Sequence, residues 1–117
     1  MIKPYTSQQP VDDFGLLFPD LKYSAALAAT TDTTLTIPGN AARYKALIKV
    51  DANVVWVALN ATAAVPAGMS FAATTSELVS DNKALCREVK AGDVLHFYTA
   101  TATTNVSVVL YGLGTNN

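Results

Sequence analysis

The chain has 117 residues, of which 50% are hydrophobic and only 15% charged, with a net charge of −1 at pH 7. That length suits one domain around one core, and the charge balance argues against broad electrostatic binding to nucleic acid or to an anionic membrane. Cys86 is the one cysteine, which excludes a disulfide within the chain and a thiolate metal cage. The sequence has no apolar run of about 18 residues to span a membrane, and its first 15 residues do not resemble a signal peptide. We therefore expect no metal, cofactor, nucleic acid or membrane ligand.

Residues 1–23 differ from the rest of the chain, because prolines that disfavour regular structure alternate with large apolar side chains. The prolines are Pro4, Pro10 and Pro19. The candidate contact residues of this segment are Phe14, Leu16, Leu17 and Phe18. A merely disordered tail would be polar and poor in aromatic residues. The pattern predicts an extended N-terminal arm, with two placements open: docking on a neighbouring molecule, or folding back over its own domain.

From residue 24 onward, short runs of alternating apolar and polar residues are separated by turn signals, as in strands joined by tight turns. Residues 24–29 allow a helical turn or a strand, and Pro38 and Gly39 favour a type II turn. The runs predicted as strands are 33–37, 45–50, 54–59, 84–89, 94–99 and 106–111, with weaker candidates at 69–71 and 76–79. The sequence therefore predicts an all-β domain over 24–117, an antiparallel β-sandwich or jelly-roll-like barrel of about seven or eight strands.

No catalytic motif is present, and the acidic residues are spread along the chain. His96 is the only histidine, and a lone histidine on a strand is more often structural or solvent-facing than catalytic. Cys86 is the only thiol nucleophile, and we expect it to be buried and inert. An enzyme would need Cys86 and His96 to meet in a cleft, so we expect a protein without catalytic activity.

The stretch VVWVAL at 54–59 carries apolar side chains on both of its faces, and the two later strands do the same. A lone two-layer sandwich would keep its outer faces polar, because monomers rarely expose a large apolar patch. We expect a neighbouring subunit to cover the second face, although the arm or long loops of the same chain are the alternative. The candidate interface residues are Val55, Trp56, Val57, Tyr98 and Tyr111. Trp56 has a further interpretation as a sugar-stacking platform.

Two runs extend this interpretation: ARYKALIKVDANVVWVALNATAAVPAGMSF, and SELVSDNKALCREVKAGDVLHFYTATATTNVSVVLYGL. Over about residues 41–113 the chain resembles small virion proteins of tailed bacteriophages. The shared features are a strand ending like VWVALN, a short Pro/Gly loop, a later KAGD turn and a final Val-rich strand. These proteins are similar to head decoration (cement) proteins, and the arm takes no part in the resemblance.

The resemblance implies a β-sandwich or jelly roll that forms homotrimers and clamps the major capsid protein. It also implies a place on the capsid exterior of a virion assembled in the bacterial host cytoplasm. We expect a structural capsid decoration protein that holds subunits together by burying apolar surface. The alternative is a host-adhesion or glycan-binding knob, or a tail-associated β-module.

Overall fold

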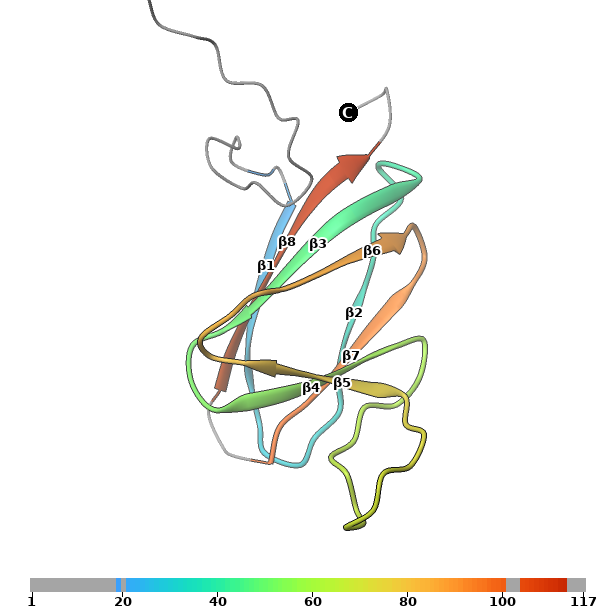
Figure 1. Cartoon of the computed structure of the whole chain (residues 1–117). Helices are drawn as coiled ribbons and strands as arrows, with labels where there is room; N and C mark the ends of the chain where they lie inside the picture. The colour runs from blue at the N-terminus through green and yellow to red at the C-terminus, as the bar shows by residue number, and fades with distance from the viewer. Residues whose placement is uncertain (1–18, 20, 101–103, 114–117) are drawn as a thin grey trace, which may run out of the picture.

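The computed structural model describes residues 19, 21–100 and 104–113, and these residues form eight strands and no helix (Figure 1). The strands are β1 (Leu21–Leu27), β2 (Thr33–Thr36), β3 (Arg43–Val50), β4 (Val54–Leu59), β5 (Ser76–Ser80), β6 (Leu85–Lys90), β7 (Val94–Tyr98) and β8 (Thr104–Leu113). The all-β prediction is confirmed, and no helix of the described residues is long and apolar enough to cross a membrane.

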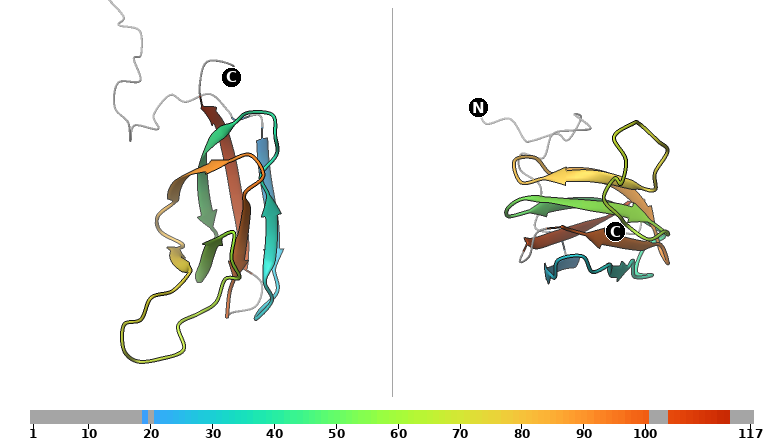
Figure 2. Two further views of the ribbon diagram at one scale, coloured as in Figure 1. Left: turned by 90° about the vertical axis from the view of Figure 1, so that its right-hand side faces the viewer. Right: turned by 90° about the horizontal axis from the view of Figure 1, so that it is seen from below.

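The eight strands form two antiparallel four-stranded sheets. Sheet A has the order β1-β8-β3-β6, and sheet B has the order β2-β7-β4-β5. This arrangement is a β-sandwich with the strand order of a jelly roll. The strands make an elongated body, and the long loop between β4 and β5 projects from one end of it (Figure 2).

The core lies between the sheets and follows the strand alternation. On β3 the inward side chains are Tyr44, Ala46, Ile48 and Val50, which are 0–5% exposed. This confirms the predicted inward face of that strand. The hydroxyl oxygen of Tyr44 also accepts a hydrogen bond from the Ala41 backbone N–H at 2.7 Å, so its one polar atom is paired.

Two turns are fixed by polar side chains. Asn53 has a φ of 62°, and Asp51, in the same turn, accepts two hydrogen bonds from Asn105 at 2.9 and 2.6 Å. Gly92 has a φ of 88°, a conformation that glycine adopts without strain. Beside it, Asp93 accepts the Lys90 backbone N–H at 2.9 Å. The first turn is therefore tied to β8 through Asn105, and the second is closed by the hydrogen bond between Asp93 and Lys90.

Two local expectations differ from the structure, and a third, left open between helix and strand, is decided by it. Gly39 does not have the positive φ of a type II turn, so that prediction is wrong. Residues 69–71 form no strand, because they find no partner in either sheet. Residues 24–27 of the ambiguous run 24–29 are the second half of β1, which ends at Leu27 and begins at Leu21, three residues before the expected start of the domain. The arm residues Phe14, Leu16, Leu17 and Phe18 lie outside the described residues.

Candidate interaction surface

The outer face of sheet B carries most of the exposed apolar side chains of the strands. In the register of β5, β4 and β7, Trp56 lies between Leu78 and Tyr98. Trp56 and Tyr98 are half-buried, whereas Leu78 is 49% and Val54 40% exposed. The sheet therefore presents an aromatic and aliphatic row to its outer side, as the two-faced strand pattern predicts.

The loop of residues 60–75 covers one part of this face. Ala58 on this face is only 2% exposed, and Ala63 in the loop is itself 1% exposed. Asp32 Oδ1 accepts the Ala63 backbone N–H at 3.2 Å, and His96 Nδ1 lies 2.8 Å from Asp32 Oδ2. Because a carboxylate can only accept, His96 Nδ1 donates the hydrogen bond. Asp32 thus ties the loop to β7.

The far end of the loop is held to its beginning by hydroxyl groups. Ser76 Oγ accepts the Ala64 backbone N–H at 3.1 Å, and Thr75 Oγ1 donates to the Thr62 carbonyl at 3.0 Å. Both residues lie where the loop returns to β5. The base of the loop is therefore closed by four hydrogen-bonding side chains, namely Asp32, Ser76, Thr75 and His96.

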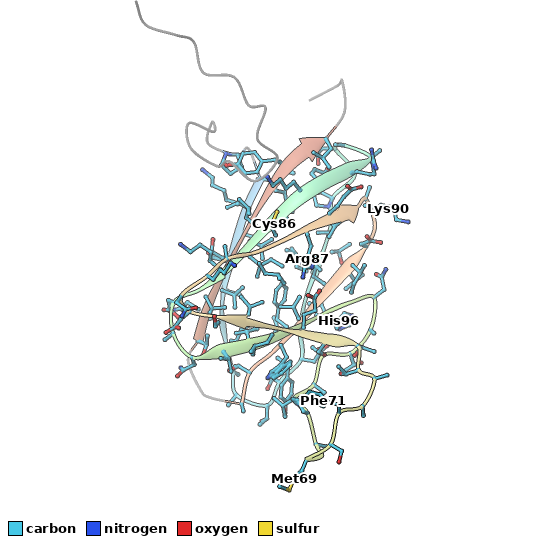
Figure 3. All side chains as sticks on the ribbon, in the orientation of Figure 1. Met69, Phe71, Cys86, Arg87, Lys90 and His96 are labelled. Atoms are coloured by element: carbon cyan, nitrogen blue, oxygen red, sulfur yellow. The ribbon has the colours of Figure 1, made fainter. Side chains whose placement is uncertain are left out.

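The tip of the loop is free of the body. Met69 is 105% and Phe71 110% exposed, and Val65 is 36% exposed. Met69 lies at the end of the loop farthest from the strands (Figure 3). No charged residue occurs between Asp51 and Glu77, so this tip is apolar without neighbouring charge. Full exposure of two large apolar side chains so close together is unusual for a surface that meets only water.

A hollow of about 540 Å³ separates the loop from the sheet. Trp56 contributes its floor, and residues 65–74 form the rest of its lining. Ser70 and Thr74 are the only hydroxyl side chains in that lining, and none of its residues is charged. The hollow is therefore shaped by apolar groups, with few donors or acceptors to orient a polar ligand.

The predicted interface residues divide between the interior and two different faces. Val55 and Val57 point inward and are 0% and 6% exposed, so a partner would have to open the sandwich to reach them. Trp56 and Tyr98 are neighbours on the outer face of sheet B. Tyr111 lies on the outer face of sheet A, opposite Lys45 in the β3–β8 register. The structure thus brings only two of these five residues together on a surface.

Cys86 and His96 lie on opposite sides of the molecule (Figure 3). Cys86 pairs with Leu47 on the outer face of sheet A, whereas His96 pairs with Ala58 on the outer face of sheet B. The two side chains therefore do not meet in a cleft of this chain. Cys86 is also exposed, so the expectation of a buried thiol is wrong. Among the described residues it lies on β6, an edge strand of sheet A.

Sequence reasoning missed two features of this surface. Asp32 gave no signal, because its partners His96 and Ala63 are distant in sequence. Met69 and Phe71 alternate with Ser70, and this alternation predicts a strand where the structure has a loop tip. Within the described residues, no group of three or more His, Cys, Asp or Glu side chains is placed to hold a metal ion.

Comparisons with known proteins add the following. No protein-family model matches the chain, and no curated protein matches its sequence. Among solved structures, the chain is similar to a protein of the Bacillus endospore appendages, described as a novel family of disulfide-linked pili. The TM-score is 0.43 and the identity 18%, with 80% of this chain and 88% of that chain covered. These findings assign no activity to the chain.

Proposed function

We propose that this chain is a structural protein that holds an assembly together by apolar contact between subunits. The observation that carries the proposal is the tip of the 60–75 loop, where Met69 and Phe71 are fully exposed. Burying one such side chain contributes about 1.5–3 kcal/mol, so two in one contact support a specific association. The closed base of the loop supports this, because a pre-ordered loop loses less entropy on binding.

Our specific proposal is decoration of the capsid exterior of a tailed phage, as a homotrimer that binds the major capsid protein. It rests on the resemblance over about residues 41–113 together with the jelly-roll order of the strands, an architecture found in viral capsid domains. The arm, with Phe14, Leu16, Leu17 and Phe18, is proposed to contact the shell or a neighbouring subunit. The action is adhesive and non-enzymatic.

Light scattering coupled to size exclusion tests the assembly proposal on the full chain, on a chain lacking residues 1–18, and on a Met69→Ser/Phe71→Ser variant. We expect the full chain to be trimeric and the loop variant to dissociate. Val54→Ser is the matched control, because Val54 is exposed on the same sheet but at the other end of β4. A full chain that stays monomeric at all concentrations contradicts the proposal.

Location is tested separately by immunogold labelling of particles from the source culture, using antibody raised against the chain. Label on the outside of phage heads is the expected result. Label on tails, or on filaments of the cell surface, would rule out the capsid-exterior assignment while leaving the assembly proposal standing.

A second candidate function is a glycan-binding knob, which the hollow beside Trp56 favours. Sugars stack on tryptophan, but they also need hydrogen-bonding groups, and this hollow offers only the hydroxyls of Ser70 and Thr74. A glycan panel probed with the full chain and with Trp56→Ala tests it. Binding that is lost with Trp56→Ala, together with a monomeric full chain, would favour the knob over the structural proposal.

A further inference from the structure

The two long sides of the sandwich are closed in different ways. At the side where β5 and β6 face each other, Arg87 and Glu77 form an ion pair that links the sheets. Arg87 is in register with Ala46, and Glu77 is in register with Val57; both of these neighbours point into the core. At the opposite side, β1 faces β2, and a slot of about 180 Å³ remains between the sheets.

This slot opens directly onto the core. Its lining includes four core residues that are 2–4% exposed, namely Leu27, Phe97, Val106 and Val108. Tyr23 and Leu35 stand at its sides, and no residue of the lining is charged. Among the described residues, β1 pairs only with β8 and β2 only with β7, so both strands bordering the slot have a free edge. Uncovered edges beside an apolar slot favour contact with another chain.

The loop tip has the properties of an occupant for this slot. Met69 and Phe71 flank the bend at the end of the loop, and both side chains are fully exposed. Both are apolar and uncovered, and the segment around them is uncharged, as is the slot. In its own chain the loop projects away from the strands and leaves the slot unfilled (Figure 2).

We propose that the tip of the 60–75 loop of one copy, led by Phe71 and Met69, inserts into the slot between β1 and β2 of a second copy. The contact uses different surfaces on the two copies, so it repeats from copy to copy and can close into a ring. A ring of three is the homotrimer of the proposed function, on which this inference rests. The arm and the outer face of sheet A are the competing contacts.

Two variants each remove one side of the contact. Met69→Ser/Phe71→Ser removes the tip and keeps the slot. Ala25→Phe fills the slot and keeps the tip, because Ala25 lines the slot and is exposed there. Ala26→Phe is the matched control, since Ala26 is also exposed but lies on the outer face of sheet A, in register with Asn105.

We expect each of the first two variants to be monomeric by light scattering, with a dissociation constant at least about tenfold larger than that of the unmodified chain. The control should assemble like the unmodified chain. Mixing the two monomeric variants should restore a one-to-one complex, because one intact tip then meets one intact slot. A mixture that stays monomeric, or an Ala25→Phe chain that still assembles, overturns the inference. If Ala25→Phe still assembles, the chain associates through another contact, and the proposed function is not contradicted.

The rate of disulfide formation between two cysteine variants tests the same contact without the bulky Ala25→Phe substitution, which could misfold the slot. In a Cys86→Ala background, chains carrying Phe71→Cys and chains carrying Ala25→Cys should form a disulfide with each other faster than either forms one with itself. Equal rates for all pairs would overturn the inference. The inference would also be overturned if the chain lacking residues 1–18 failed to assemble while the Met69→Ser/Phe71→Ser variant still assembled. In that case the arm would be the occupant of the slot.

Discussion

Asp93 uses one carboxylate oxygen to close the turn between β6 and β7 and the other to bind Asn60. Oδ2 accepts the Lys90 backbone N–H at 2.9 Å, and Oδ1 accepts from Asn60 Nδ2 at 3.2 Å. The Lys90 hydrogen bond, helped by Asn60, lowers the pKa of Asp93 below its ordinary value of 3.8. One side chain thus fastens the turn to the beginning of the 60–75 loop.

The lowered pKa of Asp93 predicts an acid-dependent loss of stability. In the unfolded chain its pKa returns to 3.8, so the unfolded state binds more protons and the free energy of unfolding falls as pH drops through that value. We expect Asp93→Ala to cost about 1 kcal/mol at neutral pH and to flatten this acid slope. Urea unfolding between about pH 5 and pH 2 measures both effects. Asp81→Ala, an exposed turn residue, is the control, and an unchanged slope in Asp93→Ala contradicts the prediction.

Cys86 gives a second prediction at the residue scale. The sequence predicts a buried thiol, whereas the structure places Cys86 on the surface. Because the side chain is exposed on β6, Cys86→Ala removes no core contact. We expect the free energy of unfolding to change by less than about 0.5 kcal/mol, as for other surface substitutions. Thermal unfolding of the reduced protein measures it. A loss of 2 kcal/mol or more, typical of a core position, would mean that another chain covers this face.

At the scale of elements, the 60–75 loop depends on a contact between parts of the chain that are far apart in sequence. Asp32 follows β1, His96 lies within β7, and Ala63 belongs to the loop. The His96 and Asp32 side chains are 18% and 27% exposed, so water competes weakly for their hydrogen bond. The loop is therefore anchored where it leaves the sheet, and its tip is held outward.

Removing the Asp32 carboxylate should loosen the loop without unfolding the sheets. Asp32→Ala leaves two part-buried N–H donors without their acceptor, so we expect a loss of about 1–3 kcal/mol. Hydrogen exchange should speed up at residues 62–64 and remain slow in β3 and β8. Thr34→Ala is the control, because Thr34 is exposed beside His96 in the β2–β7 register. Unchanged exchange at 62–64 would show that Ser76 and Thr75 suffice to hold the loop.

At the scale of the whole molecule, the strands were predictable and their partners were not. Seven of the strands follow predicted runs, and the inward face of β3 could be identified because Lys45 and Lys49 mark its other side. The run 54–59 is apolar on both faces, so its sequence alone did not show that Val55 and Val57 are the core residues. Contacts between distant residues decide that question. The slot could not be predicted from sequence for the same reason, because its position depends on the order of the strands in the two sheets.

The balance of charges predicts how any assembly of this chain responds to salt. Both the loop tip and the slot are uncharged, so hydrophobic burial rather than ion pairing would hold the copies together. We expect the dissociation constant to change less than about twofold between 0.05 and 0.5 M NaCl, and to rise on cooling. Sedimentation velocity at two salt concentrations and two temperatures measures this. A tenfold loss of affinity in high salt would instead point to the outer face of sheet A, where Lys45 and Lys49 flank Leu47.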